Sequence, residues 1–183
     1  QVIWLAGTAA ASPFPVVEQT GEWVVSDQSS SGLPRVDIDS VVAGLEKLSQ
    51  PPLLTGKRVM VTAGPTLEDI DPVRFIGNRS SGKMGFAVAA AAWRAGAEVE
   101  LIAGPVALPA PFGVNTTRVR SARDMLAAVA SAVDQVDIYI SVAAVADYRP
   151  DLQVDQKIKK AGSGFDLHLE PNPDLLRIVA AAA

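Results

Sequence analysis

The chain of 183 residues is 49% hydrophobic and 20% charged, the balance of a packed soluble domain rather than of a disordered segment. Its net charge of −4 gives no overall attraction to nucleic acid or to an anionic membrane, and the lack of cysteine excludes disulfides, thiolate zinc sites and a cysteine nucleophile. The longest apolar run, Phe86 to Trp93, is too short to span a membrane. We therefore expect a cytoplasmic protein without a nucleic-acid or membrane partner.

The N-terminal part differs in composition from the rest. Residues 1–35 are rich in turn residues around one possible strand, Trp23–Val25, and they carry no recognisable chemistry, so this segment stays unassigned. Residues 36–55 are expected to form a linker helix and a proline-rich connector. Apolar residues recur at helical spacing from Asp37 to Leu48, and Pro51 follows as a helix stop.

From residue 56 onward, strand-like and helix-like segments alternate. The predicted elements are a strand over 58–62, a helix over 84–95, a strand over 98–103, a weaker strand over 114–119, a helix over 121–133 and a buried strand over 136–146. This alternation predicts an α/β domain with a mainly parallel sheet and right-handed crossovers. Ligands of such sheets bind beyond the C-terminal strand ends, where residues 64–66, 104–105 and 146–148 fall.

The loop from Gly77 to Gly85, just before an apolar helix, has the composition of an anion-binding site. Its glycines let backbone N–H groups approach an oxyanion, Ser80 and Ser81 add donors, and the helix directs its positive end to the same point. The alternative is an ordinary Ser/Gly N-cap before a buried helix.

Two phosphate-binding fingerprints fit poorly. Residues 63–68, after the first strand, lack the Gly-x-Gly-x-x-Gly of a dinucleotide fold. Gly77–Lys83 satisfies G-x-x-x-x-G-K, but Met84 follows where a P-loop needs a hydroxyl for magnesium. A P-loop-like NTPase, with Asp147 as its second acidic motif, is kept as an alternative.

Three lysines stand within the four residues Lys157–Lys160, beside the glycine-rich residues 161–164. A solvated surface is the simplest interpretation of such a run. The other is a mobile segment whose lysines close over a triphosphate and neutralise charge as pyrophosphate leaves.

Read together, several segments resemble the bacterial phosphopantothenate–cysteine ligase family in their order and spacing, over about residues 56–176. The matching segments are Ala63–Thr66, Asp71–Arg74, Gly77–Gly85, Ala143–Arg149 and Lys157–Lys160. The resemblance implies a Rossmann-like, doubly wound domain over 56–183 and a homodimer. It also implies that residues 36–55 connect this domain to a preceding flavin-dependent decarboxylase in one bifunctional chain.

The resemblance further implies a two-step reaction in coenzyme A biosynthesis that uses CTP and Mg²⁺. The carboxylate of 4′-phosphopantothenate attacks the α-phosphate of CTP, giving an acyl-cytidylate and pyrophosphate. The amine of L-cysteine then displaces CMP. The partners expected of the chain are therefore these small molecules and a second copy of itself.

Site residues follow from the same resemblance. Asn78 would act in the second half-reaction by holding the acyl carbonyl and its developing oxyanion, and Lys157 would serve the nucleotide in the first. The residues expected to line the CTP pocket are Ser141, Val142, Ala143, Asp147, Lys157, Asn172, Pro173, Asp174 and Leu175. Those expected to bind the substrate or its anion are Gly77, Asn78, Ser80, Ser81, Gly82 and Ala144.

Other features stay open. The family continues beyond the point where this sequence ends in alanines, so we expect a truncated domain, and a catalytically incomplete nucleotide-binding or dimerisation fragment is the alternative to a ligase. No metal ligands are assigned: Glu68, Asp69 and Asp71 could hold magnesium through water or be solvated loop carboxylates. The lone His168, on a predicted strand, is expected to be structural.

Overall fold

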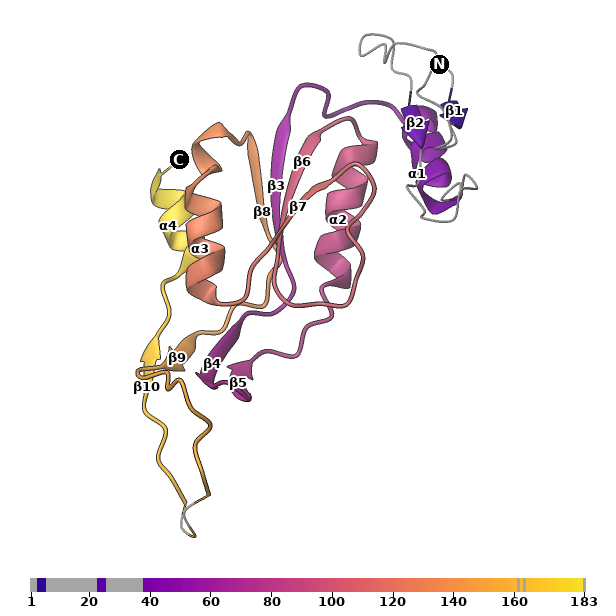
Figure 1. Ribbon diagram of the computed structural model, residues 1–183. Helices are drawn as coiled ribbons and strands as arrows, with labels where there is room; N and C mark the ends of the chain where they lie inside the picture. Colours follow the sequence, from indigo (N-terminus) through magenta and orange to yellow (C-terminus); the bar gives the residue numbers. More distant parts are fainter. Residues whose placement is uncertain (1–2, 6–22, 26–37, 161, 163, 183) are drawn as a thin grey trace.

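The computed structural model describes residues 3–5, 23–25, 38–160, 162 and 164–182. Its central sheet has four parallel strands in the order β7-β6-β3-β8. They are β3 (Arg58–Ala63), β6 (Glu98–Ala103), β7 (Asn115–Arg118) and β8 (Ile138–Ser141). Helix α2 (Lys83–Arg94) covers one face and α3 (Ala122–Ala130) the other (Figure 1). This arrangement confirms the Rossmann-like α/β fold.

The core lies on both faces of β3 and β6. Val59 and Val61 of β3 pack with Phe86 and Trp93 of α2, whereas Met60 packs on the opposite face with α3. Successive side chains of a strand point to opposite faces, so a strand covered by helices on both sides is apolar at every position. For this reason the apolar residues Val59, Met60 and Val61 are consecutive in the sequence and do not alternate with polar residues.

The N-terminal predictions are partly confirmed. Helix α1 (Ile38–Ser49) matches the helix expected over 37–48, although Asp37 lies outside the described residues. The strand expected at Trp23–Val25 is present as β2, and it pairs in parallel with β1 (Ile3–Leu5), which the sequence analysis did not predict. The division of the chain at residues 35 and 55 remains a prediction.

Two predicted elements are shorter than expected. Helix α3 ends at Ala130 and is followed by the 3-10 turn η1 (Val133–Gln135). The strand expected over 136–146 is β8 alone, half-buried at the sheet edge rather than fully buried. The next residues stay apolar because they pack as a loop on the end of β3, where the N–H of Val142 donates to the carbonyl of Thr62 at 3.2 Å. Length and hydrophobicity do not separate such a loop from a strand.

Two antiparallel pairs lie below the sheet (Figure 1). Neither pairing was predicted, although a strand was expected around His168. The first is the hairpin of β4 (Leu67–Asp71) and β5 (Arg74–Gly77), and the second joins β9 (Tyr148–Pro150) to β10 (Leu169–Pro171). Between β9 and β10, the described residues 151–160, 162 and 164–168 extend away from the sheet, and we call them the excursion (Figure 1). It contains His168, which lies one residue before β10 and pairs with Asp151 at 3.4 Å.

The chain closes with α4 (Leu175–Ala182), which packs against the α3 side of the sheet through Leu175 and Val179. Among the helices in the described ranges, none has the length and apolar character needed to cross a membrane. The loops that follow β3 and β8 connect the sheet to β4 and β9, and parallel sheets bind their ligands at these strand ends.

Candidate functional site

The loops that follow β3 and β8 are joined into one layer at the C-terminal edge of the sheet. The N–H of Ala144 donates to the carbonyl of Gly64 at 2.8 Å, and the N–H of Thr66 donates back to the carbonyl of Ala144 at 3.3 Å. The hydroxyl of Thr66 accepts from the N–H of Ala146 at 2.9 Å, and this threonine is fully buried. The β8 loop is therefore fixed by backbone bonds and by a buried side chain.

Glycines let the start of α2 and the end of β6 approach this layer. A Cβ on Gly104 would lie 1.7 Å from the carbonyl oxygen of Pro65. Gly82 is the N-cap of α2 with φ +72°, and a Cβ there would lie 3.4 Å from the Cα of Gly64. No side chain caps this helix start, although the Ser80 hydroxyl accepts from the N–H of Gly82 at 3.3 Å. The Gly82 conformation is that of a glycine turn, while anion binding by the loop remains a prediction.

Asn78 follows β5 directly and reaches across to the β8 loop. Its side-chain amide donates to the carbonyl of Val145 at 3.0 Å and more distantly to that of Ala144 at 3.4 Å. The side chain is exposed on its other side. The structure thus brings together Asn78 and Ala144, two predicted site residues from distant parts of the sequence.

Asn172 joins a second group of predicted residues to the same loop. Its side-chain amide donates to the carbonyl of Ala146 at 2.8 Å, and its backbone N–H donates to that of Asp147 at 2.7 Å. Its side-chain oxygen accepts from Arg149 at 3.0 Å. Val142 and Ala143 lie in this loop and Ser141 ends β8, so these three residues, Asp147 and Asn172 lie along one stretch of backbone.

Three other predicted residues have structural partners. Asp174 accepts a hydrogen bond from the N–H of Arg177 at 3.0 Å at the start of α4. Leu175, the first residue of α4, is buried in the core. Pro173 is partly buried. If Leu175 contributes to a nucleotide site, it does so through its backbone.

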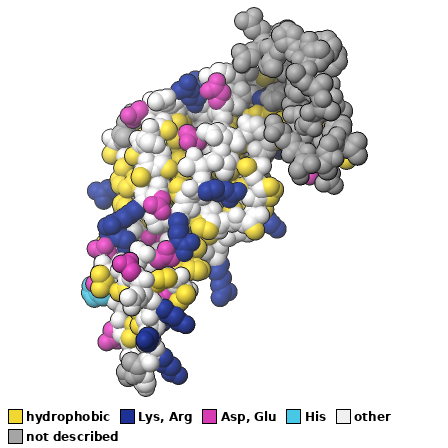
Figure 2. All heavy atoms as spheres, in the orientation of Figure 1, with side chains coloured by type: hydrophobic (Ala, Val, Ile, Leu, Met, Phe, Trp, Pro, Cys, Tyr) yellow, Lys and Arg dark blue, Asp and Glu magenta, His cyan; other side chains and the backbone are white. Residues whose placement is uncertain are grey.

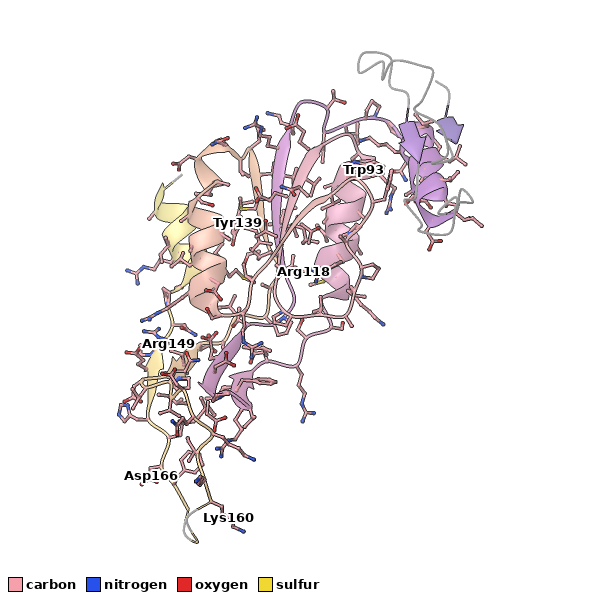
Figure 3. The ribbon with its side chains drawn as sticks, viewed as in Figure 1. Trp93, Arg118, Tyr139, Arg149, Lys160 and Asp166 are labelled. Carbon is pink, nitrogen blue, oxygen red and sulfur yellow. The ribbon has the colours of Figure 1, made fainter. Side chains whose placement is uncertain are left out.

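Lys157 lies apart from this group. It belongs to the excursion, whose far end carries Lys160 and Asp166 (Figure 3). Lysine and arginine side chains gather along that lower part of the molecule, mixed with acidic ones (Figure 2). The neighbouring residue Ile158 is bonded to Asp71 and Arg74, at the turn end of the β4–β5 hairpin, whereas Asn78 follows the opposite end of β5. The structure therefore does not place Lys157 beside Asn78.

The carboxylates after β3 correct the expectation of solvated loop residues. Glu68 is buried and accepts from the N–H of Ala122, at the start of α3, at 2.9 Å. Asp69 pairs with Arg120 at 2.6 Å. Within the described ranges, no three or more of His, Asp and Glu form a group that could hold a metal. Strand β4 thus uses its acidic residues to hold the fold together.

Asp71 is the most deeply buried of these carboxylates, with no exposed side-chain surface. Burial by itself would raise the pKa of Asp71, but hydrogen bonds from the Arg74 side chain and from the N–H groups of Val73 and Ile158 outweigh it and lower the pKa to about 2. The available sequence signal was Asp-Pro-Val-Arg, since Asp before Pro is typical of a turn in which the aspartate accepts from the following N–H groups.

Residues 54–183 match the family described as DFP, the DNA/pantothenate metabolism flavoprotein C-terminal domain. The chain is 51% identical over 143 residues to the coenzyme A biosynthesis bifunctional protein CoaBC of Vibrio cholerae, covering 77% of this chain and 36% of that protein. It is 46% identical over 151 residues to CoaBC of Escherichia coli, covering 81% and 36%. The chain thus spans about a third of the length of these relatives.

Solved structures agree. The C-terminal domain of a CoaBC protein superposes with a TM-score of 0.62 at 47% identity, covering 71% of this chain and 61% of that one. The DNA/pantothenate metabolism flavoprotein from Streptococcus pneumoniae gives 0.61 at 27% identity, covering 69% and 65%. A Cab2 mutant in complex with phosphopantothenate-cysteine gives 0.60 at 16% identity, covering 78% and 64%, a similarity of fold alone.

Proposed function

Since this chain belongs to the DNA/pantothenate metabolism flavoprotein C-terminal domain family, the phosphopantothenate–cysteine ligase part of CoaBC proteins, we propose that it joins 4′-phosphopantothenate to L-cysteine at the expense of CTP. The observation that carries the proposal is the bonding of Asn78 to the β8 loop at the C-terminal sheet edge. Parallel α/β sheets bind their ligands at this edge.

The proposed reaction has two steps. In the first, the carboxylate of 4′-phosphopantothenate attacks the α-phosphate of CTP, and pyrophosphate leaves from an acyl-cytidylate. In the second, the cysteine amine attacks the acyl carbon, CMP leaves, and the nitrogen loses a proton as the amide forms. Activation is needed because a free carboxylate is a poor acyl donor.

The Asn78 amide is suited to the second step. Its bond to Val145 at 3.0 Å is of normal length, whereas its contact with Ala144 at 3.4 Å is long for an N–H···O bond. The amide group is planar, so the hydrogen bonded to Val145 keeps Asn78 fixed and also sets the direction of the second hydrogen. This weakly held hydrogen can donate to the acyl oxygen, where negative charge develops as the amine attacks. We infer that the Ala144 carbonyl holds this second hydrogen until substrate binds.

The nucleotide would lie along the β8 loop. Ser141, Val142 and Ala143 would line it, although the N–H groups of Val142 and Ala143 already donate to Thr62. The exposed carboxylate of Asp147 is suited to a ribose hydroxyl. The loop at Gly77, Ser80, Ser81 and Gly82 would hold an anionic part of the substrate. Mg²⁺ would enter with the triphosphate, because this ion is commonly held by substrate phosphates and few protein ligands.

The proposal extends to the native protein. It would be a cytoplasmic homodimer in which a flavin-dependent decarboxylase precedes this domain; the relatives are named bifunctional proteins, which is consistent with a second enzyme in the same chain. The alternative, a fragment that binds nucleotide or dimerises without catalysis, is favoured by one observation: the chain covers only 61% of the solved C-terminal domain. Turnover by the full-length protein but not by residues 1–183 would assign the alternative to this chain alone.

The test of the function is Asn78→Asp in the full-length protein with CTP, Mg²⁺, 4′-phosphopantothenate and cysteine. The added carboxylate should repel the developing oxyanion, so pyrophosphate release continues while acyl-cytidylate accumulates and amide formation slows roughly a hundredfold. Asn115→Asp, on the exposed far edge of the sheet, is the matched control. If the variant loses both pyrophosphate release and CTP binding, Asn78 instead serves nucleotide binding or the fold.

A further inference from the structure

Ile158 is held through both of its backbone polar groups by two side chains of the β4–β5 hairpin. Its N–H donates to Oδ2 of Asp71 at 3.1 Å, and its carbonyl accepts from Nη2 of Arg74 at 2.7 Å. The Asp71 carboxylate also accepts from Nε of Arg74 and from the N–H groups of Val73 and Arg74, each at 2.9 Å. We call Asp71, Arg74 and Ile158 the hairpin clamp.

The clamp lies where the lysines of the excursion begin. Ile158 stands between Lys157 and Lys159, and both lysines are exposed while Ile158 is partly buried. A second backbone bond, from the N–H of Val154 to the carbonyl of Ile70 at 3.1 Å, ties the preceding residues to β4. The segment carrying Lys157 is therefore docked on the hairpin.

Burial makes this docking dependent on the full set of bonds. Asp71 has no exposed side-chain surface, so its charge relies on donors from the protein rather than from water. Removing one partner of a buried pair leaves the other uncompensated. Ile158 supplies one of these donors, so releasing the Lys157 segment would leave Asp71 with an unfilled acceptor position.

We propose that Asp71 is a positioning residue that, through the hairpin clamp, fixes the Lys157 segment relative to Asn78. The inference rests on the proposed function, because it takes Lys157 as a nucleotide contact. Strand β5 runs from the clamp to Asn78, and four strand residues span roughly 13 Å. The β4–β5 hairpin thus holds the Lys157 segment at its turn and ends at Asn78 on the opposite side.

The clamp is tested first without reference to activity. Hydrogen exchange of residues 154–160, followed by mass spectrometry on the full-length protein, should become at least about tenfold faster in Asp71→Asn, because the new amide hydrogens face the donors of Arg74 and Ile158. Glu68→Gln is the matched control. It changes a buried carboxylate of the same strand that binds Ala122 instead, so exchange of residues 154–160 should stay at the wild-type rate.

The positioning role is tested by single-turnover pyrophosphate release at saturating CTP and Mg²⁺. Asp71→Asn should slow release at least about tenfold, and Lys157→Gln should slow it roughly a hundredfold. The double variant should be no more than about twofold slower than Lys157→Gln alone, because residues that act through one another are not additive. Multiplying effects would show that Asp71 supports the fold and not the lysine, and would overturn the inference.

The remaining outcomes separate the inference from the proposed function. Wild-type exchange in Asp71→Asn overturns the clamp. Faster exchange with wild-type pyrophosphate release overturns the positioning role and leaves the ligase reaction standing. A wild-type protein that releases no pyrophosphate from CTP overturns the proposed function, and the role of Asp71 in it. Should Asp71→Asn not fold, Arg74→Lys keeps the cation but loses the fork that reaches Ile158, and gives the same two readouts.

Discussion

The sheet and the excursion are held together by different forces. In the sheet, β3 and β6 lie between two helices, and Met60, Leu101 and Ile102 have no exposed surface. In the excursion, Leu152 and Phe165 are 68% and 57% exposed, and the segment is attached through hydrogen bonds at Val154 and Ile158 rather than through a core. The sheet is stabilised by buried area and tight backbone contact, whereas the excursion depends on individual polar bonds.

The largest expected effect tests tight contact at the sheet end. Gly104→Ala would place a Cβ 1.7 Å from the carbonyl oxygen of Pro65, so the backbone must move, and we expect a loss of more than about 3 kcal/mol in the free energy of unfolding. Gly164→Ala, in the excursion, meets no atom within 4 Å and should change it by less than about 0.5 kcal/mol. Chemical denaturation of both variants measures the difference, and equal effects would remove the contrast between the regions.

The same contrast explains what the sequence could predict. Strand β6 was predicted with its observed bounds, 98–103. A strand buried on both faces can be predicted from the apolar composition of the strand itself. The β4–β5 hairpin was missed because Glu68, Asp69 and Asp71 resemble a solvated loop. Their burial depends on donors elsewhere, such as the N–H of Ala122, and a linear pattern does not contain these partners.

The site divides in the same way. Asn78 and Ala144 were predicted from the family resemblance, and the structure joins them through a side-chain bond that spacing alone could not show. Lys157 could be named but not placed, since its position depends on Asp71 and Arg74 holding the next residue. The strand predicted over 136–146 was several residues too long, so the loop that carries several of the predicted nucleotide contacts was not recognised as a loop.

The second prediction asks whether the excursion carries chemistry. If Lys157 contacts the triphosphate, Lys157→Gln should slow single-turnover pyrophosphate release roughly a hundredfold, because charge on the leaving group is no longer stabilised. Lys159→Gln is the matched control, an exposed lysine two residues away in the same segment. Thermal melting should show both variants folded. Equal rates of pyrophosphate release in the two variants would show that Lys157 is an ordinary solvated surface lysine.

A third, smaller effect concerns acid. The pKa of Asp71 lies near 2 in the folded protein, below its ordinary value of 3.8, so the unfolded chain takes up the proton first as the pH falls. The contribution of Asp71 to stability is therefore complete above about pH 4 and is lost as the pH falls toward 2. Denaturant titrations at several pH values should show a steeper loss over this window in the wild type than in Asp71→Asn. If the free energies of unfolding of the wild type and of Asp71→Asn fall in parallel with pH, the lowered pKa of Asp71 is contradicted.

The smallest expected effect compares two ion pairs of one strand. Asp69 and Asp71 both lie on β4 and both bind an arginine. The Asp69 side chain is 22% exposed and its partner Arg120 52%, whereas the Asp71 carboxylate has no exposed surface and its partner Arg74 is 38% exposed. Water competes for the partners of the exposed pair, so Arg120→Gln should lower the free energy of unfolding by no more than about 1 kcal/mol and should leave exchange of residues 154–160 unchanged. Adding about 0.5 M salt should reduce even this difference, because exposed charges are screened. A loss well above that value, insensitive to salt, would show that the Asp69 pair also anchors the hairpin, and the distinction between its two aspartates would fail.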